Sequence, residues 1–204
     1  MSDIIKRLVD TIAPLSLTTA YTVPTRKYAV VKSAVICNQT SSDLLFTLTI
    51  GGIDIATNHL LKGYGTLILD ELDIPMLATE RIMISSSNNN CAMYLSGFER
   101  DYFVSEYPYL KIRTVTNTRI TTLPNNDFDA MIRSIIICNG NGSGVSSNVS
   151  VQAPWHVINN KEIKARDTLL VPNLKLFLPK ERGISFIGTN TGVSLAIILE
   201  KVMQ

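Results

Sequence analysis

Apolar and polar residues alternate along most of this chain, in short runs typical of β-strands with one buried face. In Phe46–Ile50, apolar residues alternate with threonines, and Gly51-Gly52 ends the run. The run from Tyr28 to Cys37 is β-branched and largely apolar, which predicts a central strand. Turn signals recur roughly every dozen residues, and this spacing predicts a β-sandwich or a Greek-key barrel.

The first residues of the chain have a different period. Between residues 3 and 12, the apolar residues recur at the spacing of one helix face, and charged residues take the other positions. Ser2 is a suitable N-cap, and Pro14 would stop a helix. We therefore expect a short N-terminal arm, helical or extended, that packs on the first domain or docks on a neighbouring subunit. The apolar residues of this face are Ile4, Ile5, Leu8, Val9 and Ile12, and the first four are candidates for an interface.

One segment of the chain occurs twice. Lys32–Asn38 reads KSAVICN, and Arg133–Asn139 reads RSIIICN, 101 positions later. After a one-residue slip, Thr66–Leu69 matches Thr168–Val171. Solenoid repeats recur at about 20–50 residues, so this longer period predicts the tandem duplication of a whole domain. The charged residues that match at a displacement of 101 beyond the slip are Glu80, Arg81 and Glu99, opposite Glu181, Arg182 and Glu200.

The length of 204 residues is sufficient for two small domains that each hold a core. We predict an all-β chain of two tandemly duplicated β-sandwich domains, Ig-like or Greek-key. The N-terminal arm precedes them, and we find no copy of it in the second half. The predicted parts are the arm at 1–16, domain 1 at 17–100, a linker at 101–109 and domain 2 at 110–204.

The predicted linker contains more aromatic residues than a flexible connection would. Its rings either pack between the domains and fix their orientation or contribute to a contact between subunits, because aromatic residues are enriched at interfaces. Together with the four apolar residues of the arm, they are our candidate interface residues. The linker members are Tyr102, Phe103, Tyr107 and Tyr109.

Composition and charge exclude several classes of protein. The net charge is +2 and the basic residues are not clustered, so we expect no nucleic-acid partner. Charges interrupt the apolar residues near the N-terminus, and no run of about 18 apolar residues occurs, so we expect neither a secretory signal nor a membrane span. The 3 cysteines lack the spacing of a metal site, and we expect free thiols.

No pattern of residues predicts a catalytic site, a metal site or a cofactor. His59 and His156 have no cysteine, histidine or carboxylate at the spacing of a zinc site. The loop Asn139–Gly144 lacks the Lys-Ser/Thr end of a phosphate-binding loop, and we interpret it as a hairpin loop. Asp70 and Glu80 are candidate carboxylates for a glycosidase, but the acidic segment around Asp70 is not repeated. We therefore expect a protein that is not an enzyme.

The order of several short motifs resembles a known family. Tyr21-Thr22-Val23-Pro24, followed by Lys27, leads into the strand segment Val31–Asn38, and the repeat closes on Gly97-Phe98-Glu99. This order resembles small β-sandwich domains in structural proteins of tailed bacteriophages. The resemblance covers the first repeat, and the second repeat more weakly. It implies a virion component that is made in the cytoplasm of a host bacterium.

The predicted function is therefore mechanical. We expect a non-enzymatic structural component of a tailed-phage virion, located in the neck, tail or baseplate or on the capsid. Its expected partners are other virion proteins and further copies of itself. The alternative is a tandem glycan-binding module for host recognition, for which Trp155 and the loops Asn88–Asn90 and Thr189–Thr191 are the candidate features.

Overall fold

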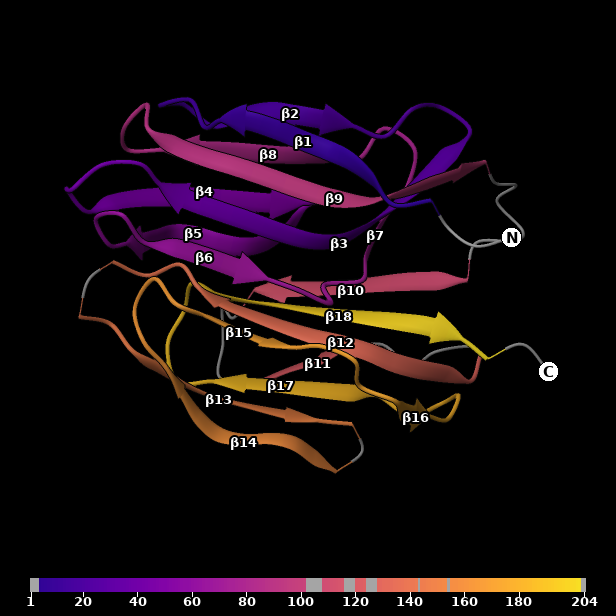
Figure 1. The fold of residues 1–204 in the computed structure, drawn as a ribbon. Helices are drawn as coiled ribbons and strands as arrows, with labels where there is room; N and C mark the ends of the chain where they lie inside the picture. Colours follow the sequence, from indigo (N-terminus) through magenta and orange to yellow (C-terminus); the bar gives the residue numbers. More distant parts are fainter. Residues whose placement is uncertain are drawn as a thin grey trace. The chain divides into compact units, whose positions relative to one another are not determined.

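The computed structural model describes residues 4–101, 108–115, 120–123, 128–142, 144–153 and 155–202. All regular structure in these residues is β-strand, arranged in small antiparallel sheets, which confirms the all-β prediction (Figure 1). The described residues contain no helix that is long and apolar enough to cross a membrane. The chain divides into two compact units, Met1–Tyr107 and Pro108–Gln204. The finer domain boundaries drawn from the sequence stay a prediction.

The first unit contains two sheets. One sheet comprises β1 (Lys6–Ile12), β3 (Lys27–Asn38), β6 (Thr66–Leu69), β7 (Ile74–Met76) and β9 (Cys91–Asp101). Its order is β1-β9-β3-β6, and β7 pairs with the opposite end of β3. The other sheet comprises β2 (Thr18–Thr22), β4 (Leu44–Ile50), β5 (Ile53–Leu61) and β8 (Arg81–Ser86). Its order is β2-β8-β4-β5.

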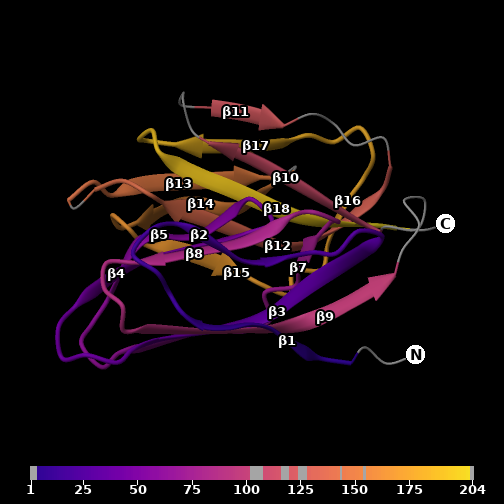
Figure 2. The same ribbon diagram turned by 90° about the horizontal axis from the view of Figure 1, so that it is seen from above.

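The second unit also contains two sheets. One comprises β10 (Tyr109–Val115), β12 (Ala130–Asn139), β15 (Thr168–Val171), β16 (Leu176–Leu178) and β18 (Val193–Lys201), in the order β10-β18-β12-β15, and β16 pairs with β12. The other comprises β11 (Ile120–Leu123), β13 (Ser147–Gln152), β14 (His156–Ile163) and β17 (Ile184–Gly188), in the order β11-β17-β13-β14. Figure 2 shows β11 beside β17, at the edge of this second sheet.

In both units the first strand lies beside the last, and the second strand lies beside the last but one. This is the strand order of a jelly roll, in which two Greek keys form a two-sheet sandwich. An immunoglobulin-like sandwich places its first strand beside its second in one sheet. This strand order differs from that of an immunoglobulin-like sandwich.

The core of each unit is built from alternating positions of its strands. In the first unit, Phe46 on β4 and Leu95 on β9 are 1% and 0% exposed. In the second unit, a buried cluster joins Ile135 and Ile197 of one sheet to Phe186 of the other. Every second residue of β4 is buried, as the alternation in the sequence predicts.

The N-terminal segment contains the strand β1, so of the two predicted forms of the arm the extended one agrees with the structure and the helical one is wrong. β1 pairs antiparallel with β9, and the register shifts between Arg7 and Val9, so Leu8 is an extra residue. Because of this bulge, Leu8 and Val9 are both buried, with 8% and 3% of their surfaces exposed. Two adjacent buried residues in a strand have the same sequence pattern as one turn of an amphipathic helix. The segment also has a counterpart, because β10 pairs with β18 as β1 pairs with β9.

The two units repeat each other in the details of their backbones. The register between β3 and β9 shifts around Lys32, and the register between β12 and β18 shifts around Arg133, 101 positions later. Further along, Asn58 and Asn160 have left-handed conformations with φ of 48° and 47° and stand 102 positions apart. The same turns and bulges therefore recur in both units, which is the pattern that a tandem duplication leaves.

The late matches drawn from the sequence are displaced by one residue. By register, Glu99 corresponds to Lys201 rather than to Glu200, because Glu99 and Lys201 pair with equivalent alanines of β3 and β12. By backbone conformation, Glu181 corresponds to Thr79, since their φ angles are 67° and 71°. The identical acidic residues of the two halves are therefore coincidences of sequence and do not occupy equivalent sites.

Candidate functional site

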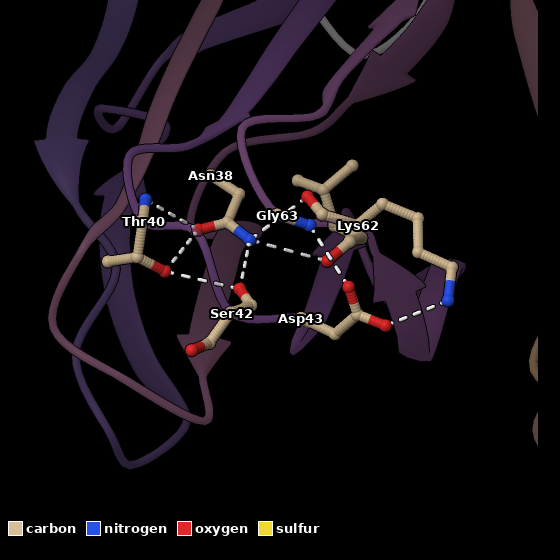
Figure 3. Close-up of polar contacts among 7 residues, drawn as sticks. Asn38, Thr40, Ser42, Asp43, Lys62 and Gly63 are labelled. Atoms are coloured by element: carbon tan, nitrogen blue, oxygen red, sulfur yellow. Dashed lines mark hydrogen bonds and ion pairs between the residues drawn. The ribbon is translucent and has the colours of Figure 1, made fainter.

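Asn38 ends β3 and connects three segments of the first unit (Figure 3). The residue is 1% exposed, and its Nδ2 donates to the carbonyl oxygens of Ser42 at 2.8 Å and Lys62 at 3.0 Å. Its Oδ1 accepts hydrogen bonds from the backbone N–H of Thr40 at 3.0 Å and from the Thr40 hydroxyl at 2.9 Å. The buried amide thus has partners for its donors and its acceptor, and it holds the loop after β3 against the turn after β5.

The same loop ends at Asp43. Its carboxylate accepts hydrogen bonds from Lys62 Nζ at 2.8 Å and from the backbone N–H of Gly63 at 3.0 Å (Figure 3). The hydrogen bond from Lys62 makes the largest contribution to lowering the pKa of Asp43, and the hydrogen bond from Gly63 makes the next largest. At Gly63, a Cβ atom would lie 2.0 Å from the carbonyl oxygen of Ser41. The two segments are therefore in direct backbone contact, without room for a ligand between them.

The second unit repeats this arrangement with a longer loop. Asn139 is 0% exposed, and its Nδ2 donates to the carbonyl oxygens of Val145 at 2.9 Å and Ile163 at 3.1 Å. Its Oδ1 accepts a hydrogen bond from the backbone N–H of Asn141 at 3.1 Å. β12 and β13 belong to different sheets, so the glycine-rich loop between them crosses between sheets and is not the hairpin that the sequence suggested. The repeated asparagine belongs to the framework of both units.

A second polar cluster surrounds Glu99 on β9. The Tyr21 hydroxyl, on β2 of the opposite sheet, donates to Glu99 Oε1 at 2.5 Å. Lys6 Nζ lies 2.5 Å from the same oxygen, and Lys27 Nζ lies 3.6 Å from Oε2. Burial alone would raise the pKa of Glu99, but the hydrogen bonds from Lys6 and Tyr21 outweigh it and lower that pKa. Burial, together with the hydrogen bond to Glu99, raises the pKa of Tyr21.

The Glu99 cluster joins the two sheets of the first unit and has no equivalent in the second. Lys201 stands at the position of Glu99, and its Nζ lies 5.0 Å from the centre of the Phe128 ring. The sequence places Tyr21 and Glu99 in short motifs but does not predict that they are in contact. They are 78 residues apart and lie in opposite sheets, so no local periodicity predicts their contact.

The candidate interface residues lie in different environments. Leu8 and Val9 are in the core of the first unit, whereas Ile4 and Ile5 are 84% and 53% exposed. Tyr109 is the first residue of β10 and is half-buried. The remaining candidates lie outside the described residues, and they are Tyr102, Phe103 and Tyr107.

Three further apolar side chains are exposed around β1, and the sequence analysis did not name them as interface residues. Ile12 is 43% exposed, Leu15 is 63% exposed and Leu17 is 47% exposed. Together with Ile4 and Ile5 they form what we call the N-terminal apolar strip. Exposed apolar residues that gather in one segment are typical of a surface that contacts another protein.

The residues considered for catalysis are dispersed. His59 packs edge-on against Phe46, with ring centres 5.3 Å apart, and His156 Nε2 lies 2.6 Å from Gln152 Nε2. Asp70 Oδ1 accepts a hydrogen bond from the backbone N–H of Glu71 at 2.9 Å, and Glu80 Oε2 accepts one from the backbone N–H of Leu77 at 2.8 Å, so each carboxylate binds its own turn. Within the described part of the chain, no group of three or more histidine, cysteine, aspartate and glutamate side chains is placed to hold a metal ion.

The three cysteines are free thiols. Cys37 and Cys91 lie on the neighbouring strands β3 and β9 of one sheet. Burial raises the pKa of Cys91 to about 11, so its thiol stays protonated and unreactive near neutral pH. Cys138 is buried in the second unit, in the position that corresponds to Cys37.

Comparison with known proteins finds similarity only at the level of structure. No family model matches the sequence, and no curated protein matches it. The major capsid protein P2 from bacteriophage PM2 is 8% identical, with 100% of this chain and 99% of that chain covered, at a TM-score of 0.35. The STIV major capsid protein is 9% identical, with 99% and 97% covered, at a TM-score of 0.31. A conserved protein of unknown function from Pseudomonas aeruginosa PAO1 is 7% identical, with 97% and 100% covered, at a TM-score of 0.28. At these scores, the similarity carries no functional assignment.

Proposed function

We propose that this chain is a non-enzymatic structural subunit of a virion, which acts by making protein–protein contacts. The observation that carries the proposal is the N-terminal apolar strip. It exposes apolar side chains on the outside of a unit whose buried amide and clustered ionic groups are already paired within the chain. Such a surface is suited to contact with another protein, because contact would remove its apolar side chains from water.

The resemblance of the first repeat to tailed-phage structural proteins supports the same class of function. Its motif residues Tyr21 and Glu99 form the contact between the two sheets, so the motif corresponds to a structural feature of the fold. Within this proposal, the neck, the tail, the baseplate and the capsid surface are the candidate locations. The jelly-roll order of both units is compatible with each of them.

The test is to look for the chain in purified particles. Virions from an infected culture would be treated with nuclease, banded on a density gradient and analysed by quantitative mass spectrometry. We expect peptides of this chain in the particle band at a fixed ratio to the major capsid protein, and immunogold labelling would show their location. A chain that is abundant in the infected cells but absent from the particles would overturn the proposal.

A second candidate function, glycan binding, is favoured by Trp155. Its side chain is 82% exposed between β13 and β14, as expected of an aromatic platform for a sugar ring. Only glycine residues occupy the corresponding turn of the first unit, so the feature is not duplicated. Glycan-array binding that is lost in a Trp155→Ala variant would support this function, whereas an array without signal would exclude it for the glycans displayed.

A further inference from the structure

β1 is the edge strand of its sheet. It pairs with β9 on one side, and none of the strands in the described residues pairs with its other side. A groove of about 450 Å³ lies between β1 and β2 and is lined by Arg7–Thr11 together with Thr19 and Ala20. Solvent therefore reaches this side of β1. An open edge presents backbone N–H and C=O groups to which another strand can add.

The bulge at Leu8 determines which side chains share the outer face of β1. In a regular strand, Arg7 and Asp10 would lie on opposite faces, because they are an odd number of residues apart. The extra residue brings them to the same face, where Arg7 Nη1 and Asp10 Oδ2 lie 2.6 Å apart. Ile5, two residues before Arg7, and Ile12, two residues after Asp10, are also exposed.

These four residues form a self-complementary sequence. If a second β1 lies antiparallel to the first, with a two-fold axis between Leu8 and Val9, then Arg7 of each copy faces Asp10 of the other. Ile5 of each copy then faces Ile12 of the other. A shift of one residue in either direction would remove the Arg7–Asp10 contacts, so charge and apolar contacts select one register.

We propose that β1 is a homodimerisation edge, at which two copies of this chain join their β1 strands antiparallel about a two-fold axis between Leu8 and Val9. The contact is isologous, because each copy contributes the same strand, and it makes one sheet that is continuous across the two copies. Leu15 and Leu17, in the segment between β1 and β2, are also exposed. The partner in this contact is a second copy of the chain, and the contact does not require that the chain lie in a virion.

The equivalent edge of the second unit does not have this property. β10 pairs with β18 as β1 pairs with β9, but its charged residues are Lys111 and Arg113, and it contains no acidic residue. Two β10 strands paired antiparallel around Ile112 would place Lys111 of each copy opposite Arg113 of the other. Like charges at directly opposed positions destabilise a strand pair. The proposal is therefore specific to the first unit.

Charged residues on an edge strand can also prevent pairing with other strands. The experiment must therefore distinguish charges that prevent pairing from charges that select a partner of complementary charge. Sedimentation equilibrium of the full chain would be measured for wild type, Arg7→Asp, Asp10→Arg and the double swap Arg7→Asp/Asp10→Arg. Circular dichroism and thermal unfolding would establish that each variant is folded. Lys111→Asp, on the edge of the second unit, is the matched control.

We expect a concentration-dependent dimer for wild type and for Lys111→Asp. Each single swap should raise the dimer dissociation constant by at least about tenfold, because it places like charges opposite each other twice per dimer. The double swap should restore the dimer. An equimolar mixture of the two single variants should form a heterodimer, because one copy is then acidic at both positions and the other is basic.

Three results would overturn the inference. Wild type could sediment as a monomer at all concentrations, the single swaps could dimerise as wild type does, or the mixed single variants could fail to associate. These results are distinguishable from failure of the virion proposal. If the chain dimerises through β1 but is absent from particles, the dimerisation proposal stands and the virion proposal is overturned. If the chain is present in particles but does not dimerise through β1, only the virion proposal stands.

Discussion

The two units have the same strand order and the same buried asparagine at the end of the third strand, but their charged groups are arranged differently. In the first unit, Glu99 binds Tyr21 and two lysines between the sheets. In the second, Glu200 pairs with Arg133 across neighbouring strands of one sheet. The asparagine that fixes the backbone is therefore repeated, whereas these ionic groups are not. Substitutions at equivalent positions can show which features belong to the fold and which to one unit.

The largest difference is expected where glycine is required in one unit only. Gly63 corresponds to Ala165, since the residues that follow, Tyr64 and Arg166, both have left-handed φ angles, 54° and 63°. Gly63→Ala should destabilise the first unit by at least about 3 kcal/mol, because its Cβ would lie 2.0 Å from the Ser41 carbonyl oxygen. Ala165→Gly should cost the second unit about 1 kcal/mol or less. Native-state hydrogen exchange, followed by mass spectrometry, would measure each unit separately.

The loop lengths explain why alanine is tolerated in the second unit. Asn38 binds the carbonyl oxygen of Ser42, whereas Asn139 binds that of Val145, so the second loop is two residues longer. A longer loop can follow a path that leaves room for a methyl group. If Gly63→Ala had no effect on exchange in the first unit, the close backbone contact would be contradicted. Gly65→Ala is a suitable comparison, because its nearest contact is less severe, at 2.9 Å from the Lys62 carbonyl oxygen.

The asparagines should behave alike in both units. Asn38→Ala and Asn139→Ala should each destabilise their own unit by about 2–3 kcal/mol, because each substitution leaves several buried backbone groups without a partner. The measurement is again unit-resolved hydrogen exchange, with the other unit of the same chain as an internal control. A large loss in one unit and none in the other would contradict a shared framework.

The strands could be predicted because they rest on a local pattern, and so does the repeated segment. β3 and β12 are central strands, and their apolar runs are long enough to be recognised as copies. The helix predicted at the N-terminus failed because a bulge at Leu8 makes adjacent residues share a face. The late matches failed because loops of different length shift the alignment, and only strand register reveals that Lys201 stands at the position of Glu99.

The candidate site was less predictable than the fold. Ile4 and Ile5 were predicted as interface residues. Ile12 was placed on the same apolar face but was not an interface candidate, and Leu15 and Leu17 were not assigned to a surface. An apolar residue is exposed when no neighbouring strand or sheet covers it. Which strands are neighbours depends on the order of strands in the sheets, and local sequence does not give that order. The sequence pattern of β1 does not reveal that the strand lies at an edge.

A smaller difference is expected from pH, because only the first unit has the Glu99 cluster. The pKa of Glu99 is lower in the folded chain than in the unfolded chain, where glutamate titrates at about 4.3. Its contribution to stability is therefore present at neutral pH and is lost as the pH falls below about 4 through the folded pKa. Glu99→Gln should cost the first unit about 1–2 kcal/mol at pH 7 and progressively less in acid.

Thermal unfolding and unit-resolved exchange at several pH values would measure this effect. Tyr21→Phe removes one donor to Glu99, so the cost of Glu99→Gln should be smaller in that background than in wild type. The second unit lacks the cluster and should show the same pH dependence in all these variants. A cost of Glu99→Gln that is independent of pH would contradict a lowered pKa.

The smallest effects are expected at two equivalent serines, and they should have opposite signs. Ser33 Oγ on β3 lies 2.7 Å from Ser96 Oγ on β9, which is hydrogen-bond distance. At the equivalent pair, Ile198 takes the place of Ser96. The Oγ of Ser134 is buried and has no hydrogen-bond partner among the described residues. Ser33→Ala should therefore destabilise the first unit by about 1 kcal/mol, because Ser96 loses its partner.

Ser134→Ala should instead stabilise the second unit by about 0.5–1 kcal/mol, because it removes a buried hydroxyl that has lost its hydrogen bonds to water without gaining another. Denaturant unfolding monitored by unit-resolved exchange can detect changes of this size when the two variants are measured in parallel. Ser33→Ala/Ser96→Ala is the control, because removing both partners should cost less than removing one. Equal effects of the same sign at Ser33 and Ser134 would mean that the partner residue at position 96 or 198 does not determine the cost of the buried hydroxyl.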